Sequence, residues 1–197
     1  MKKCIFLIAL IFIFLNACKQ KKDPEASAEQ KEDFFPVLSF LKSQVAEIDT
    51  SLFSIKKITV TDSIHSDTVF IPREEFRSLA KDFLDIPDLA EKKYKKRFSE
   101  EKLFDESLNR VIITYTPIDP DKEEIQKQEV LITPNPTGDK VNNIIIDRVA
   151  SNKDGFLQQR MLWQVDRSFQ VTTTSQKPAQ PETTKTLKVT WNDKEEE

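Results

Sequence analysis

The side chains best suited to chemistry in this sequence lie around its single histidine. Asp62, His65 and Asp67 follow one another closely, and carboxylates with an imidazole form a ligand set that divalent metals accept. The same segment is typical of a turn, where aspartate bonds to its own backbone. We therefore favour a surface position for His65, with a metal site as the alternative. A Ser-His-Asp triad would need the same histidine, and the glycine pattern of a nucleophile elbow does not occur.

A second group of carboxylates lies in the segment from Asp119 to Glu124. Its acidic residues could surround a calcium ion, but the EF-hand loop needs a glycine for its sharp turn and none is present. Pro120 indicates an ordinary turn instead. A glycan hydrolase would need two carboxylates facing each other across a cleft, and no spacing selects such a pair. We therefore assign no catalytic residue and no metal ligand.

Three other groups of residues are candidates for binding. Arg160, Gln164 and Asp166 alternate with apolar residues, so we expect them on the wet face of a strand, as a binding surface or in cross-strand ion pairs. The segment Lys92–Phe98 interleaves basic and aromatic residues. It could rest on anionic lipid headgroups, although the neighbouring acids Glu91, Glu100 and Glu101 favour a solvated helix face.

The two tryptophans, Trp163 and Trp191, could stack against a ligand. Both stand at apolar positions of an alternating pattern, so a place in the hydrophobic core is the interpretation we favour.

The elements that position these residues begin with a helix. Apolar residues recur at helical spacing from Val37 to Ile48, with Asp33 as the expected N-cap and Pro36 in the first turn. Two strands, 54–62 and 67–71, follow as a hairpin.

A second helix is expected between Pro72 and Pro87. Its predicted apolar face consists of Phe76, Leu79, Ala80, Phe83 and Leu84. Residues 88–106 are ambiguous, and one or two short helices are expected there. These would pack through Leu89, Tyr94, Phe98, Leu103 and Phe104.

The second half of the chain has the character of strands separated by turns that contain proline or glycine. The expected strands cover residues 110–116, 125–133, 141–150, 155–174 and 186–192. The fourth shows the clearest alternation, from Met161 through Trp163 to Val171. The segment Asn152–Gly155 is a hairpin signal. The order of elements predicts an α+β fold, with an antiparallel sheet of about five to seven strands and two to four helices on one face.

The N-terminus has the features of a targeting signal. Lys2 and Lys3 precede an apolar run, Ile5–Leu15, that is too short for a spanning helix, which needs about 20 residues. The run ends in Leu-Asn-Ala-Cys, residues 15–18. This tetrad resembles the lipobox of bacterial lipoproteins, and the resemblance covers about the first twenty residues.

The resemblance implies that a signal peptide, residues 1–17, is removed and that Cys18 carries the lipid. Two or three acyl chains would give attachment that is close to permanent. Lys19, where an aspartate would favour retention in the inner membrane, implies the outer membrane of a two-membrane bacterium, with the domain facing the periplasm. Residues 18–33 would then be a disordered tether with a span of roughly 20 Å, residues 34–193 one α+β domain, and residues 194–197 a disordered tail.

Composition excludes several classes of function. Loss of Lys2 and Lys3 would take the net charge from −3 to −5, which argues against a nucleic-acid binder. Two glycines are too few for a phosphate-binding loop. With Cys4 removed and Cys18 acylated, the domain would have no disulfide, thiolate zinc site or thiol nucleophile.

The sequence therefore predicts a membrane-anchored envelope lipoprotein without cofactor or enzymatic activity. It would bind an envelope protein or an apolar ligand. The alternatives are an accessory subunit of an envelope assembly with no ligand pocket, and a carboxylate-dependent glycan hydrolase. A carrier needs an apolar cavity behind the sheet, a subunit needs an exposed apolar patch or an open sheet edge, and a hydrolase needs facing carboxylates.

Overall fold

The computed structural model describes residues 33–61, 65–153 and 155–192. The chain divides into two units, Met1–Asp33 and Phe34–Glu197, and the fold described below is that of the second. The expected signal peptide, Cys18, the tether up to residue 32, Asp62 and the tail at 194–197 lie outside the described residues. Within the described part, no helix is both long enough and apolar enough to cross a membrane.

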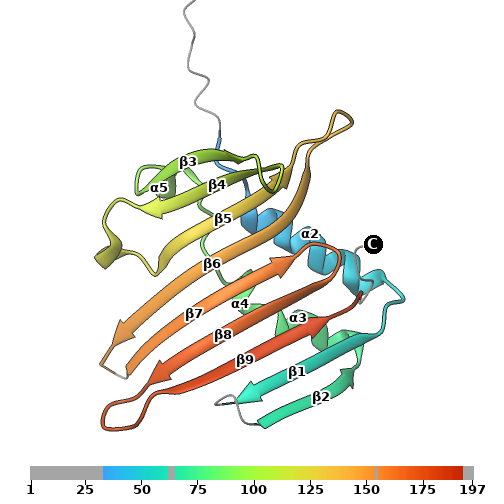
Figure 1. The fold of residues 1–197 in the computed structure, drawn as a ribbon. Coiled ribbons are helices and arrows are strands. Elements are labelled where there is room, and N and C mark those ends of the chain that lie inside the picture. The colour runs from blue at the N-terminus through green and yellow to red at the C-terminus, as the bar shows by residue number, and fades with distance from the viewer. Residues whose placement is uncertain (1–32, 62–64, 154, 193–197) are drawn as a thin grey trace, which may run out of the picture. The chain divides into compact units, whose positions relative to one another are not determined.

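One antiparallel sheet forms the body of the second unit (Figure 1). In the described residues its order is β2-β1-β9-β8-β7-β6-β5-β4-β3, so β3 to β9 form a meander and the β1–β2 hairpin is added beside β9. The strands are β1 (Ile55–Thr61), β2 (His65–Ile71), β3 (Phe98–Asp105), β4 (Arg110–Pro117), β5 (Ile125–Thr133), β6 (Lys140–Asn152), β7 (Gly155–Gln164), β8 (Ser168–Gln176) and β9 (Thr183–Thr190).

The α+β class and the antiparallel sheet are confirmed, but the expected five to seven strands are too few. The segment 155–174, predicted as one strand, is the β7–β8 hairpin, in which Asp166 turns the chain at a φ of 62°. Trp163 pairs with Phe169 across this turn. Because three residues lie in the turn, paired residues share the same alternation. The pattern therefore runs through the hairpin without a break and imitates one long strand.

The other unexpected strand is β3. Short helices were the prediction for 88–106, and this prediction is wrong for residues 98–105, which pair with β4 along their whole length. Only Phe98 of β3 is buried. Leu103 and Phe104 point to opposite faces and are 58% and 50% exposed, so no alternating pattern marks this edge strand.

Helices α2, α3 and α4 cover one face of the sheet (Figure 1). In α2 (Val37–Thr50) the predicted apolar stripe is buried, but Pro36 takes the N-cap position instead of Asp33 and no side chain caps the helix. The remaining helical elements are η2 (Arg73–Glu75), α3 (Phe76–Leu79), α4 (Lys81–Leu84), α5 (Lys92–Lys95) and η3 (Pro120–Lys122).

The helix expected between Pro72 and Pro87 is broken into η2, α3 and α4. Ala80 separates α3 from α4 with a ψ of 3°, which is outside the helical range. The predicted apolar face survives the break, because Phe76, Ala80 and Phe83 are all fully buried. Gln159 on β7 donates a hydrogen bond of 3.1 Å to Asp82 and so ties α4 to the sheet.

The core between these helices and the sheet is aromatic. Phe83 meets Trp163 edge-on with ring centroids 5.2 Å apart, and Phe76 meets Trp191 in the same way at 5.2 Å. Phe169 stacks on Trp163 at 5.4 Å. Such pairs add about 0.5–1.5 kcal/mol each beyond their buried area. The core interpretation of the two tryptophans is confirmed, since their exposed fractions are 0% and 4%.

Candidate functional site

The residues singled out as a binding surface do not converge. Arg160 and Gln164 lie on the face of β7 opposite Trp163, which is the face that α2, α3 and α4 leave uncovered. Four residues of strand separate them by roughly 13 Å. Gln164 accepts a hydrogen bond of 2.7 Å from Ser168, and Asp166 is used in the β7–β8 turn. Their positions favour structural roles in the hairpin.

Charges on this open face are arranged across neighbouring strands. Arg160 stands opposite Asp147 in the β6–β7 register, and Asp147 lies 3.9 Å from Lys127 on β5. Lys127 also pairs with Glu129 at 3.3 Å. This arrangement fits the cross-strand alternative that the sequence left open, and each such exposed pair contributes little to stability.

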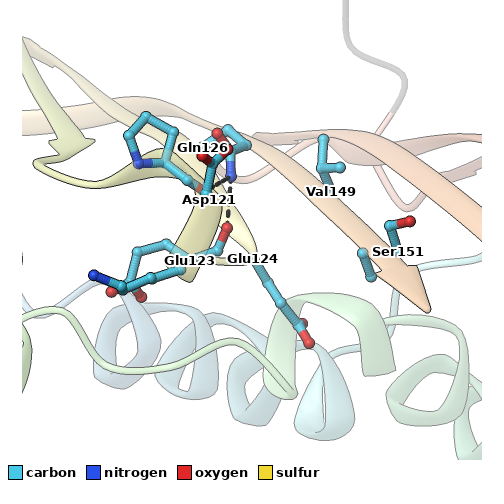
Figure 2. A pocket seen from close by; sticks show the side chains of 9 residues that line it. Asp121, Glu123, Glu124, Gln126, Val149 and Ser151 are labelled. Carbon is cyan, nitrogen blue, oxygen red and sulfur yellow. Dashed lines mark hydrogen bonds between the residues drawn. The ribbon is translucent and has the colours of Figure 1, made fainter.

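Three carboxylates of the acidic segment, Asp121, Glu123 and Glu124, line a hollow of about 500 Å³ (Figure 2). Its other walls are Gln126 on β5 and Val149–Ser151 on β6. Gln126 donates a hydrogen bond of 3.0 Å to the carbonyl of Pro120 and another to that of Glu123, which fixes the η3 turn against β5.

Two acids of this hollow, Glu123 and Glu124, are engaged by basic side chains. Arg148 holds Glu124 through two donors at 2.6 and 3.0 Å, and Arg97 donates a short hydrogen bond to Glu123, whose side chain is only 8% exposed. Lys122 lies 2.6 Å from Asp119. A neighbouring hollow of about 370 Å³, between Tyr94 and Glu123, shares Lys122, Glu123 and Glu124 with the first. The segment is thus tied into the fold by ion pairs.

The proposed metal ligands are only partly described. His65 and Asp67 are exposed on β2, which agrees with a surface position for the histidine, and Asp62 lies outside the described residues. Within the ranges that the structure describes, no group of three or more His, Cys, Asp or Glu side chains is placed to hold a metal ion.

A buried glutamine was missed by sequence reasoning. Gln128 on β5 is 0% exposed, and neither atom of its amide has a hydrogen-bond partner in the described part of the chain. Its position faces the core because a β-bulge after Ile125 shifts the register of β5 against β6. Because of this shift, Gln128 does not stand at an inward position of the alternation that starts at Ile125, so the sequence pattern did not predict its burial.

The two strands at the ends of the sheet are the surfaces best suited to an interaction. β2 pairs with β1 through an unbroken register of seven residues, and no other described strand pairs with its far side. It contains no lysine, arginine or proline, and Asp67 is its one acidic residue. Natural edge strands normally carry such residues, because the unpaired backbone groups otherwise attract other chains.

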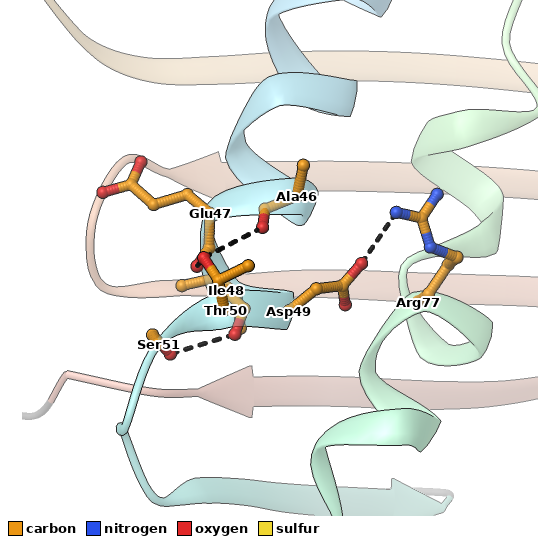
Figure 3. A network of polar contacts seen from close by, with 7 residues as sticks. All are labelled: Ala46, Glu47, Ile48, Asp49, Thr50, Ser51 and Arg77. Atoms are coloured by element: carbon orange, nitrogen blue, oxygen red, sulfur yellow. Dashed lines mark hydrogen bonds and ion pairs between the residues drawn. The ribbon is translucent and has the colours of Figure 1, made fainter.

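Large apolar side chains are exposed at one end of the β1–β2 hairpin. Leu52, Phe53 and Phe70 are 96%, 47% and 76% exposed, and we call these three residues the β2-edge group. The loop that carries two of them follows the end of α2, which is held in place by a 2.7 Å ion pair between Asp49 and Arg77 of α3 (Figure 3).

The opposite edge, β3, is half charged, although it also exposes Leu103 and Phe104. Four of its eight residues are Glu100, Glu101, Lys102 and Asp105. Lys102 and Glu100 are 3.6 Å apart. An edge with such charges is protected from pairing with another strand.

The described chain enters the domain beside this charged edge. The ring of Phe34 lies 4.6 Å from that of Tyr115 on β4, and the amide of Phe35 donates a hydrogen bond of 2.8 Å to the Tyr115 hydroxyl. Burial is the main cause that raises the pKa of Tyr115, so the phenol stays neutral. In the sequence, Tyr115 only continues the alternation that includes Ile113, so nothing there indicates its contact with Phe34 and Phe35.

Comparison with known proteins gives no relative for this chain. No protein-family model matches it, and neither a curated protein nor a solved structure matches it. What the protein does therefore has to be inferred from its own residues: a buried aromatic core, a polar open face, carboxylates held in ion pairs and two unlike edges.

Proposed function

We propose that this protein is a lipid-anchored envelope protein without enzymatic activity that binds a partner protein through the edge strand β2. In this proposal Cys18 carries the lipid, residues 18–33 are the tether, and the domain faces the periplasm from the outer membrane. The role is that of an accessory subunit, which the sequence left open beside the binding of an apolar ligand.

The observation that carries the proposal is made at β2. No other described strand pairs with its far side, it has no lysine or proline to protect it, and exposed apolar side chains lie beside it. An extended segment of another protein can add to such an edge through backbone hydrogen bonds, while its side chains contact the neighbouring surface. Phe70 and the loop residues Leu52 and Phe53 offer apolar contacts at the same end of the hairpin.

The filled core favours a partner protein over a carried apolar ligand. A carrier binds its ligand in a cavity behind the sheet, lined mainly by apolar side chains. Here that space is occupied by fully buried rings, among them Trp163, Phe83 and Phe169. The two hollows described above lie around the ion pairs of Glu123 and Glu124 instead.

The hydrolase alternative finds little support in the same hollows. General acid–base cleavage of a glycan needs two carboxylates that face the scissile bond. Glu123 and Glu124 are adjacent in sequence, and each is held by an arginine of the fold.

The edge proposal is tested by photo-crosslinking in the native envelope. A photoreactive residue at Phe70 should give a specific crosslink to another protein, whereas one at Leu103 on β3 should not. Leu103 is the matched control, since it is also an exposed apolar residue on an edge strand. Crosslinks of equal yield at both positions, or none at position 70, would overturn the proposal.

The anchor is tested separately by the intact mass of the purified native protein. We expect a chain that begins at Cys18 and carries acyl groups, and a Cys18→Ala chain without them. A native chain that begins at Met1 without acyl mass would show that the lipobox resemblance is misleading.

A further inference from the structure

One basic segment has no role in the proposed partner binding. Residues Glu91–Arg97, which we call the basic turn, contain four lysines, one arginine and one glutamate. They include α5, which leads directly into the charged edge β3. We propose that the basic turn, with Ile118 beside it, is the surface on which the domain rests on an anionic bilayer. This inference depends on the lipid anchor of the proposed function, but not on the partner.

The nearby acids cancel only part of the charge of the basic turn. Glu123 is held by Arg97, Glu124 by Arg148 and Asp119 by Lys122. Within the turn, Glu91 pairs with Lys93 at 2.9 Å. Lys93 and Arg97 of the turn are thus each paired with an acid, but the turn remains positive overall, because its own sequence has five cations against the single acid Glu91.

The basic turn is held in a fixed orientation by Tyr94. The tyrosine ring is partly buried and packs against the core cluster. Lys93 lies over this ring at 4.8 Å from its centroid, and Arg97 lies at 5.3 Å. With the aromatic ring inward, Lys92, Lys93 and Lys96 are exposed and Lys95 is partly buried. Amphipathic basic side chains take such positions at a membrane interface.

An apolar side chain stands next to the turn. Ile118 is 68% exposed, and its amide donates a hydrogen bond of 2.8 Å to the carbonyl of Arg97. Basic residues around an exposed apolar side chain are typical of a surface that lies in the headgroup region.

The point at which the chain enters the domain favours a membrane as the binding partner of this surface. Phe34 contacts Tyr115, which lies three residues before Ile118 on the same stretch of chain. This separation is roughly 10 Å. The fifteen residues between Cys18 and Phe34 reach roughly 20 Å on average, so the acyl chains hold this end of the sheet near the bilayer. Figure 1 shows α5 at the same end of the sheet as the start of α2.

Charge complementarity sets the expected strength of the contact. Each lysine near an anionic surface raises the affinity about fivefold. Replacing Lys92, Lys93, Lys95 and Lys96 together by glutamine should therefore release the surface from the bilayer while the acyl chains keep the protein attached.

The test uses the mature acylated chain in vesicles of phosphatidylethanolamine and phosphatidylglycerol that contain a headgroup quencher. Because Cys18 would be acylated, an Ile118→Cys variant offers one free thiol for a fluorescent dye, and Phe70→Cys is the matched control. We expect at least twofold stronger quenching at position 118 than at position 70. The difference should disappear in the four-glutamine variant and in vesicles of phosphatidylcholine alone.

Equal quenching at the two positions, or a difference that survives the four glutamines, would overturn the membrane surface. Either result, if obtained with a correctly acylated chain, would not contradict the proposed lipid anchor or the proposed binding role of the β2 edge. A chain without acyl mass would overturn both the anchor and this inference. Thermal unfolding of the four-glutamine variant serves as the control for folding.

Discussion

The two edge strands of the sheet differ in composition, although each pairs with a single strand among the described residues. β3 is half charged and adjoins the basic turn and the entry of the chain, whereas β2 has one acidic residue and adjoins the β2-edge group. Unprotected edges promote unwanted pairing. In the proposed function, β3 needs this protection because nothing binds it, whereas β2 is covered by a partner.

The distance between the edges gives this difference a functional meaning. Eight steps between neighbouring strands separate β2 from β3, or roughly 38 Å. If the β3 end rests on the bilayer, then the β2 edge is presented away from it, within reach of other envelope proteins.

The largest expected effect concerns the core that holds both edges in one sheet. Trp163→Ala should lower the free energy of unfolding by about 3–5 kcal/mol, because the indole contacts rings from α3, α4, β8 and the segment after β9. Phe70→Ala, at the exposed edge, should change it by less than about 0.5 kcal/mol. Urea unfolding of both variants measures this, and a large loss for Phe70→Ala would show that β2 is part of the core.

The second prediction places a protecting charge on the bare edge. Thr68→Lys in the middle of β2 should reduce partner capture at least about tenfold, because a lysine on an edge strand opposes the addition of another strand. Leu103→Lys on β3 is the matched control and should leave capture unchanged. Pull-down from envelope extract under equal expression gives the comparison, and an unaffected Thr68→Lys variant would contradict a role for the edge.

The third prediction concerns the β3 end, where Tyr115 holds the start of the domain. Tyr115→Phe removes the hydrogen bond from the Phe35 amide and should cost about 1 kcal/mol. The folded protein raises the pKa of this phenol above its ordinary value of 10.0, so the stability that the neutral phenol provides is present below pH 10 and is lost as pH rises further.

Unfolding by urea between about pH 8 and pH 11 measures this alkaline loss, which follows from the raised pKa of a neutral buried phenol. Tyr115→Phe should show a flatter dependence than the wild type, and Tyr94→Phe serves as the control. A wild type whose stability does not fall more steeply than that of Tyr115→Phe above pH 10 would contradict the burial of this hydroxyl.

The smallest expected effect comes from removing the protection of β3. Replacing Glu101 and Lys102 by threonine should leave stability within about 0.5 kcal/mol but increase self-association, because the edge then resembles β2. Light scattering as a function of concentration measures this. A variant that stays monomeric would mean that the charges of β3 are not its protection.

The sequence was sufficient for elements with a clear period. The buried stripe of α2, the β1–β2 hairpin and the strands β4, β5, β6 and β9 follow from spacing and turn residues alone. The β7–β8 hairpin was missed because its turn has an odd number of residues and uses Asp166 in place of glycine. Its length was the available signal, since a strand of twenty residues far exceeds the usual range.

The candidate site was harder to predict from the sequence than the fold. Whether a strand lies at an edge depends on its neighbours, and neither the bare side of β2 nor the exposure of Phe70 can be read from the spacing of residues. The basic turn was visible in the sequence. Its proximity to Tyr115, and through it to the start of the domain, required the pairing of β3 with β4.

The most direct measurement is hydrogen–deuterium exchange of the full acylated protein, in the native envelope and after purification. The account predicts that the amides of β2 exchange at least about tenfold more slowly in the envelope, because a partner strand accepts their outward hydrogen bonds. The amides of β3 should show no such slowing. Equal exchange of β2 in both preparations, or slowing confined to β3, would contradict the central claim.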